Sequence, residues 1–221
     1  MKHQDCNFVS SNIKIMNSII KESLQRSMSY STYRSLVKRL VEDNSNSGLE
    51  KNESLAEFTK LNDKRMNRWD KTLKISEEDQ KRLNNFQENI TWLVITESWC
   101  GDAAHIVPVL YKVAELININ FRVVLRDENL ELMDMFLTNG ASAVPKLIMI
   151  DNVSGEVLNT YGPRPSEATQ MVLDYKEKHG VITAEFKEEL QHWYNNNKGQ
   201  NVVDDLAAML CKLEPSICQQ N

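Results

Sequence analysis

The clearest pattern along the chain is a set of short apolar runs in its central part. Residues 92–96, 121–125 and 146–150 are rich in branched apolar side chains, and continuous runs of this length predict buried strands. The turn-rich segment 151–155 leads into 156–161, which predicts a hairpin with the strand before it. These runs place a sheet at the centre of the fold.

Helical spacing of apolar residues fills the segments beside these strands. Ser76 begins a capping-box pattern, which predicts the start of a helix that continues to about Glu88. Pro108 is expected to interrupt another helix, and the polar segment 43–48 is expected to form a linker. The predicted helices cover residues 13–28, 33–41, 55–73, 76–88, 103–117, 129–138, 184–194 and 202–213, with one more after Pro165.

The order strand, helix, strand, helix, hairpin, helix is typical of a compact α/β domain. We therefore expect this domain at residues 91–180. Residues 1–90 are predicted to form a helical N-terminal extension, and residues 181–221 a C-terminal helical extension. The amphipathic helices before the sheet need a surface that buries their apolar stripes, and the α/β domain is the simplest candidate.

Composition narrows the range of partners. The hydrophobic fraction of 41% and the charged fraction of 26% are those of an ordinary globular protein. The net charge of −5, with no concentrated basic stretch, argues against nucleic acid as the main partner. No apolar run approaches the roughly 18 residues that span a bilayer, and the first residues show no secretory signal pattern. We expect a cytoplasmic protein with no membrane partner.

The four cysteines, Cys6, Cys100, Cys211 and Cys218, are widely scattered. Their spacing fits neither a zinc site nor a disulfide scaffold. The expectation for a reducing compartment is four free thiols, and the sequence predicts neither a metal site nor a cofactor.

The residues around Cys100 resemble the active site of the thioredoxin superfamily. The run Trp99-Cys100-Gly101-Asp102-Ala103 matches the first three positions of that family's Trp-Cys-Gly-Pro-Cys turn, and Pro108 stands at the family's offset in the next helix. Val144-Pro145 stands at the offset of the family's cis-proline, directly before an apolar strand. The chain is similar to a bacterial single-cysteine branch. The resemblance implies a thioredoxin-like mixed-sheet α/β sandwich, here with additional helices at both ends.

Three positions depart from the thioredoxin pattern. Ala103 replaces the second cysteine, Asp102 replaces the proline of the turn, and Val94 stands where the family has a buried acid. In a dithiol enzyme the second cysteine resolves the mixed disulfide that the first one forms. Cys100 therefore lacks a local thiol that could complete this cycle.

The chemistry of the remaining thiol depends on opposing effects. A helix N-terminus favours the thiolate of Cys100, whereas the negative charge of Asp102 opposes it. The sequence does not fix the pKa, and we expect partial activation at most. A cis Pro145 would bring the backbone of Val144 beside Cys100, where it either pairs with an extended substrate segment or persists as a determinant of the fold.

Other residues are weaker candidates, each with a structural alternative. Glu97 and Ser98, the polar residues before the cysteine, can line the site or only form the turn. His105, after the cysteine, is expected to face solvent or to pack against other side chains. An arginine after the hairpin can bind a carboxylate or a glutathione group, or lie on the surface, and the remaining cysteines can act as distant resolving thiols. These candidates are Glu97, Ser98, His105, Arg164, Cys6, Cys211 and Cys218.

Three functions remain open from the sequence. The first is a monothiol thiol–disulfide oxidoreductase, in which Cys100 forms a mixed disulfide with a protein or a low-molecular-weight thiol and an external thiol resolves it. The second is a non-catalytic binding module, favoured by the missing second cysteine. The third is a redox sensor in which oxidised Cys100 pairs with another cysteine. The oligomeric state is open.

Overall fold

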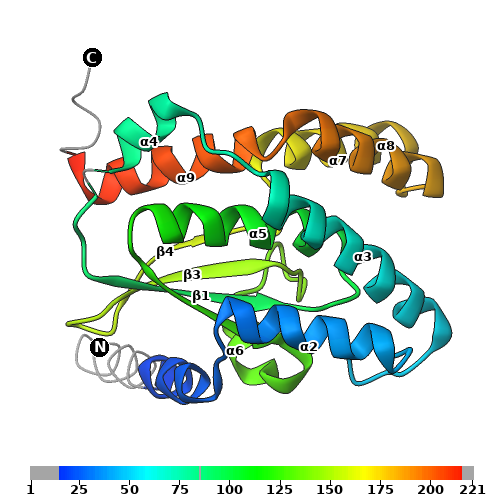
Figure 1. Ribbon diagram of the computed structural model, residues 1–221, viewed down its shortest axis with the longest axis horizontal. Coiled ribbons are helices and arrows are strands. Elements are labelled where there is room, and N and C mark those ends of the chain that lie inside the picture. The colour runs from blue at the N-terminus through cyan, green and yellow to red at the C-terminus, as the bar shows by residue number, and fades with distance from the viewer. Residues whose placement is uncertain (1–14, 85, 216–221) are drawn as a thin grey trace, which may run out of the picture.

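The computed structural model describes residues 15–84 and 86–215, arranged around a central sheet (Figure 1). The sheet has the order β2-β1-β3-β4, with β1 parallel to β2 and antiparallel to β3, and β3 antiparallel to β4. All four predicted strands are present. They are β1 (Ile90–Thr96), β2 (Asn120–Leu125), β3 (Lys146–Asp151) and β4 (Val157–Tyr161).

Helices cover both faces of this mixed sheet, as the sequence predicted. On one face, α5 packs with α3 and α9, whereas the helical segment 15–26 and α6 cover the other (Figure 1). The α-helices after this segment are α2 (Tyr30–Glu42), α3 (Glu53–Thr72), α4 (Glu77–Leu83), α5 (Gly101–Leu116), α6 (Leu130–Met135), α7 (Ser166–His179), α8 (Ala184–Asn197) and α9 (Gln200–Leu213).

Strand β1 explains the continuous apolar run because both of its faces are buried. Trp92 and Val94 point into the core under α5, while Leu93 and Ile95 point into the second core against α6. Alternation of side chains along a strand assigns successive residues to opposite faces. The strand thus leads from the most buried part of the sheet to the turn that contains Cys100.

Two helix predictions need correction. The helix begun by Ser76, whose side chain accepts a hydrogen bond from the N–H of Asp79, ends at Leu83 rather than near Glu88. The chain must leave it there to bury Phe86 and enter β1. The expected interruption at Pro108 is wrong, since α5 continues through it. Burial of the helix in the core outweighs the backbone hydrogen bond that proline removes.

The predicted turn-rich linker at 43–48 connects α2 to α3, but its second half is buried. Asn46 has no exposed surface. The N–H of Ser47 donates to Ser98 Oγ at 2.9 Å, and the N–H of Ser98 donates to Ser47 Oγ at 2.8 Å. The polar groups of this segment are thus hydrogen-bonded to buried groups just after β1. In a single sequence, such a segment looks the same as a loop exposed to solvent.

The expectation of four free thiols is corrected as well. Cys211 is held in a disulfide, and Cys100 is the free cysteine of the described residues. Cys6 and Cys218 lie outside the described residues. Across residues 15–84 and 86–215, no helix is long and apolar enough to cross a membrane and no cluster of metal-ligating side chains occurs.

Candidate functional site

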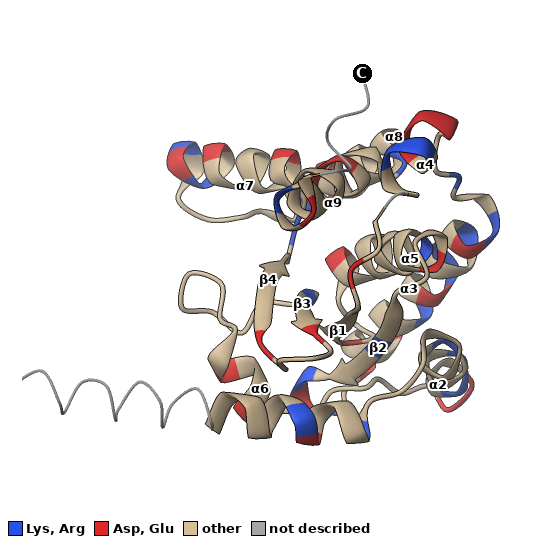
Figure 2. Ribbon diagram, turned by 90° about the vertical axis from the view of Figure 1, so that its left-hand side faces the viewer, with Lys and Arg blue, Asp and Glu red and all other residues tan. Residues whose placement is uncertain are grey.

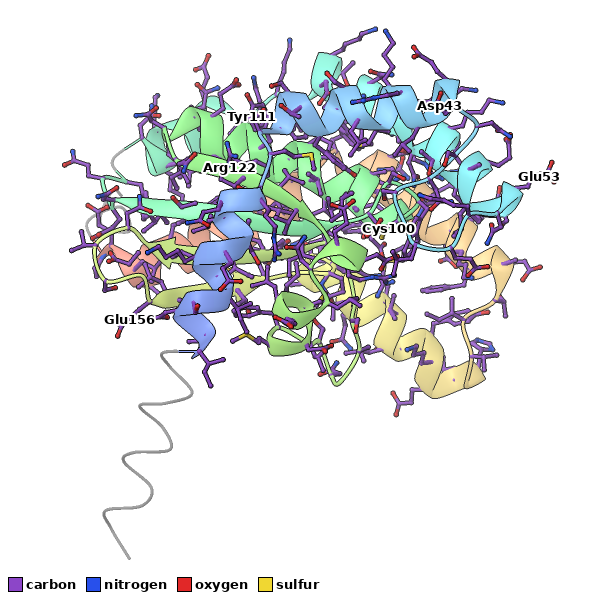
Figure 3. The ribbon with its side chains drawn as sticks, turned by 90° about the horizontal axis from the view of Figure 1, so that it is seen from below. Asp43, Glu53, Cys100, Tyr111, Arg122 and Glu156 are labelled. Carbon is purple, nitrogen blue, oxygen red and sulfur yellow. The ribbon has the colours of Figure 1, made fainter. Side chains whose placement is uncertain are left out.

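Cys100 is the N-cap residue of α5, at the point where the chain leaves β1. Its Sγ donates a hydrogen bond to the carbonyl of Val144 at 3.1 Å, and the Val144–Pro145 peptide bond is cis. Cys100 lies toward the end of the molecule that holds the α2–α3 connection, marked by Asp43 and Glu53 in Figure 3. The fold therefore brings the two predicted parts of the site into contact.

The environment of Cys100 holds it as a neutral thiol. Burial raises its pKa to about 12, and the negative charge of Asp102 adds to this effect. Backbone N–H groups of Asp102 and Ala103 at the helix N-terminus lower the pKa, as does Arg164, but they do not prevail. The partial activation expected from the helix N-terminus is therefore not found.

Asp102 ties the active-site turn to two later parts of the chain. Its Oδ2 lies 2.6 Å from Nη2 of Arg164, and its Oδ1 accepts a hydrogen bond from the hydroxyl of Tyr194 at 2.9 Å. Burial raises the pKa of Asp102, while Arg164 and the Tyr194 hydrogen bond lower it. One role expected for Arg164 is to bind a carboxylate. It does bind one, but this carboxylate is Asp102 of the same chain.

The polar residues before the cysteine face away from it and fasten the end of β1. Glu97 has no exposed surface, accepts hydrogen bonds from Ser47 Oγ and from the N–H of Asp127, and has a pKa raised by burial. The carbonyl of Ser98 accepts from Nδ2 of Asn62 on α3 at 2.9 Å. Both residues position the turn, which matches the structural alternative for them.

Trp99 packs against Arg126 and the segment 46–48. The guanidinium carbon of Arg126 lies 4.9 Å from the centre of the indole ring, a distance at which a cation interacts with the ring face. A side chain on Gly48 would lie 2.9 Å from the indole nitrogen, so glycine is needed there for the close approach. The aromatic residue of the turn therefore anchors the 46–48 segment.

With this geometry established, comparison with known proteins identifies the family. A family model described as Thioredoxin matches residues 48–179, more than half of the chain. The chain belongs to this thioredoxin family. The match begins before α3 and so includes helices that precede the sheet. No curated protein matches the sequence.

Two solved structures are similar to this thioredoxin-family protein. An HIV epitope scaffold of the 4E10 series is 18% identical with a TM-score of 0.50, and the match covers 83% of this chain and 98% of the scaffold. A protein of unknown function from Pseudomonas aeruginosa, PA1234, is 17% identical with a TM-score of 0.48, covering 70% of this chain and 89% of that one. At this identity the first likeness shows the fold alone.

In this thioredoxin-family protein we predict that Asp102→Asn makes Cys100 more reactive. Asp102 raises the pKa of the thiol, so removal of its charge lowers that pKa and also leaves Arg164 free to attract the thiolate. The rate of alkylation by iodoacetamide at pH 8 should rise by about threefold or more. The pKa should stay above that of an ordinary thiol, because burial remains the largest cause.

Asp134→Asn, at an exposed position on α6, is the control for charge removal. It should leave the alkylation rate at the wild-type value. An Asp102→Asn rate at or below wild type would show that Asp102 does not restrain the thiol.

His105 is a packing residue, one of the two roles expected for it. Its ring is buried and stacks on Tyr194, with 4.6 Å between ring centres. Nε1–H of Trp69 donates to Nδ1 at 3.0 Å, so the other ring nitrogen carries the proton and donates to Oε1 of Gln191 at 2.9 Å. His105 thereby joins α5 to α3 and α8.

Because His105 is buried as a neutral base, we expect the unfolding free energy of the protein to fall in acid. Burial lowers its pKa to about 3, below the ordinary 6.5 of an unfolded chain. A base whose folded-state pKa is depressed contributes stability above the unfolded pKa and loses it as the pH falls. Between pH 7 and pH 4 this group should account for about 3 kcal/mol of lost unfolding free energy, measured by urea denaturation.

His105→Phe keeps the ring and removes the titration. Its unfolding free energy should fall less than that of wild type between pH 7 and pH 4, because the imidazole no longer takes up a proton on unfolding. Glu97 and Asp102 are present in both proteins, so their contributions cancel in the comparison. His192→Phe, at an exposed position, should keep the wild-type pH dependence. Equal slopes for wild type and His105→Phe would contradict this assignment.

Proposed function

We propose that this protein forms mixed disulfides through Cys100 and relies on an external thiol for their release. The observation that carries the proposal is the position of Sγ at the N-terminus of α5, 3.1 Å from the carbonyl of Val144. A thiol beside the backbone that precedes a cis-proline can react with a partner that pairs with this backbone as an added strand.

The chemistry of the proposed reaction is thiol–disulfide exchange. The thiolate of Cys100 attacks one sulfur of a disulfide, the new S–S bond forms as the old one breaks, and the leaving thiolate takes up the proton that Cys100 has lost. Because the pKa of Cys100 is about 12, the thiolate fraction at neutral pH is small and the resting protein reacts slowly. The partner must also displace the hydrogen bond to Val144.

An external thiol is required because the usual resolving position is closed. Ala103 is a buried methyl group within the core under α5. Among the described residues Cys100 is the free cysteine, and Cys211 is held in a disulfide. A mixed disulfide on Cys100 should therefore persist until a small thiol or a reductase attacks it.

A second function, a non-catalytic binding module, is favoured by one specific observation. Burial and Asp102 together hold Cys100 as a neutral thiol that already has a hydrogen-bond partner. In a binding module the sulfur of Cys100 would only pack within the fold, and partners would bind without forming a covalent bond.

Capture of partners from cell extract separates the two functions. Wild-type protein is incubated with extract at pH 8.5, free thiols are blocked, and proteins released from it by dithiothreitol are identified. Cys100→Ser serves as the blank, because it keeps the size of the residue and removes the sulfur. The proposal expects proteins that appear on wild type alone. The same proteins on both samples would support the binding module and contradict the mixed-disulfide function.

A further inference from the structure

The space over Gly101, next to the reactive sulfur, is bordered by polar nitrogen atoms. A Cβ placed on Gly101 would lie 3.6 Å from Nη1 of Arg65 and 3.7 Å from Nε2 of Gln191. These distances leave room for an atom in van der Waals contact. Arg65 extends from α3 and Gln191 from α8, so helices before and after the sheet meet above the turn.

Arg65 is a partly buried cation whose hydrogen bonding is incomplete. Within the described residues its guanidinium donates one hydrogen bond, to the neutral Oδ1 of Asn62 at 2.8 Å, although a guanidinium carries five N–H donors. Four other partly buried arginines of the described residues have more partners. Arg34, Arg126 and Arg164 each have a carboxylate partner, and Arg122 donates to two oxygen atoms of Ser27. Arg82 on α4 is partly buried without an ion pair, but it lies away from the Cys100 turn in the sequence and on another helix.

The charges around the turn leave an excess of positive charge. Arg65, its neighbour Arg68 and Arg164 are positive, and Asp102 is the negative group near them. Arg164 already occupies one oxygen of Asp102, and Tyr194 the other. His105, which packs behind Gln191, is neutral because its pKa is about 3. The basic and acidic residues of the outer helices are otherwise interspersed (Figure 2).

A planar guanidinium with free donors binds a carboxylate in two parallel hydrogen bonds. The side-chain amide of Gln191 can donate to the same group. Nε of Arg164 is likewise buried without a hydrogen-bond partner, so a second arginine at the turn has an unused donor.

The geometry points to a carboxylate site over Gly101, formed by Arg65 and Gln191, that selects acidic low-molecular-weight thiols and disulfides for reaction at Cys100. This inference rests on the proposed function, because Cys100 supplies the reacting sulfur. We take the ligand to be a small compound, because the space over Gly101 lies between side chains of α3 and α8. Such a compound would also supply the external thiol that release requires.

The reaction with a symmetrical acidic disulfide is balanced. Cys100 loses its proton and attacks one sulfur, the S–S bond of the small molecule breaks, and a new S–S bond joins Cys100 to one half. The other half leaves as a thiol and takes up the proton. The reverse reaction, with an acidic thiol as the attacking group, releases the protein.

The kinetic test uses two small disulfides that differ in charge. Dithiodipropionate carries a carboxylate on each half, and hydroxyethyl disulfide is neutral. Formation of the adduct at Cys100 is followed by intact mass at pH 8.5, and each rate is divided by the rate of the same disulfide with a free reference thiol. The normalised ratio of acidic to neutral disulfide should be about five to ten for wild type. Arg65→Gln should bring this ratio close to one.

Lys64→Gln is the matched control, because it removes one positive charge from the adjacent, exposed position of the same helix. It should keep the wild-type ratio. A wild-type ratio of one or less, or an equal loss in Lys64→Gln, would overturn the carboxylate site while leaving the mixed-disulfide function in place.

A binding test keeps the two proposals separable if no adduct forms. Thiodipropionate, the unreactive thioether with the same carboxylates, is titrated into wild type and Arg65→Gln by calorimetry. Binding to wild type that is at least about fivefold weaker in Arg65→Gln supports the site even if Cys100 proves inert. No binding to wild type, or equal binding to both proteins, overturns it.

Discussion

Replacing Ala103 with cysteine is expected to turn the single-thiol site into a dithiol site that completes its own redox cycle. Cys100 is the N-cap of α5 and Ala103 lies three residues later in its first turn, so the backbone N–H of Ala103 already lowers the pKa of the thiol. A thiol there can attack a mixed disulfide on Cys100 and release the partner. Reduction of an insulin-type substrate with dithiothreitol should rise on the order of tenfold above wild type.

The internal disulfide gives this prediction a direct readout. After mild oxidation, Ala103→Cys should lose both free thiols together, and peptide mapping should join position 103 to Cys100. Ala104→Cys is the matched control, since Ala104 is equally buried on the next position of the helix. A variant that stays reduced, or equal gains in both variants, would show that the turn does not have the geometry of a dithiol site.

Gly162→Ala is expected to give the largest loss of stability of any single methyl addition in the site. Gly162 has a φ of +104°, a conformation that costs an L-residue energy, and an added Cβ would lie 2.3 Å from the carbonyl oxygen of Pro145. That oxygen belongs to backbone and has little room to move. The strain and the clash together should lower the unfolding free energy by about 3–5 kcal/mol in urea denaturation.

Gly155→Ala separates the clash from the strain. Gly155 has a φ of +73°, and no atom lies within 4 Å of its added Cβ. Its substitution should cost about 1–2 kcal/mol, the strain alone. The Gly162→Ala protein should also show altered alkylation of Cys100, because Pro145 follows the residue that binds the thiol. Equal losses in the two variants would contradict the close approach of the hairpin to Pro145.

Much of the fold could be predicted because it follows from local pattern. Three of the four strands are short apolar runs and the fourth follows a turn-rich segment, while Trp99, Pro108 and Pro145 stand at offsets from Cys100 that are typical of one family. These signals lie within short stretches of chain, where periodicity and spacing are visible.

The environment of the thiol could not be predicted, because it is assembled from distant segments. Arg65 and Tyr194 reach the turn from α3 and α8 and carry no motif of their own. The buried Ser47 has its hydrogen-bond partners, Glu97 and Ser98, about fifty residues later in the chain. For the same reason the pKa of Cys100 remained open, since burial, its largest cause, is set by helices far apart in the sequence.

Formation and persistence of an adduct at Cys100 test the central claim most directly. Reduced wild-type protein is treated with hydroxyethyl disulfide at pH 9, the reagent is removed, and intact mass is followed over hours with peptide mapping. We expect one adduct on Cys100, absent from Cys100→Ser, that persists without added thiol and disappears when a small thiol is supplied. No adduct on Cys100, or its spontaneous release at the same pH, would contradict the account.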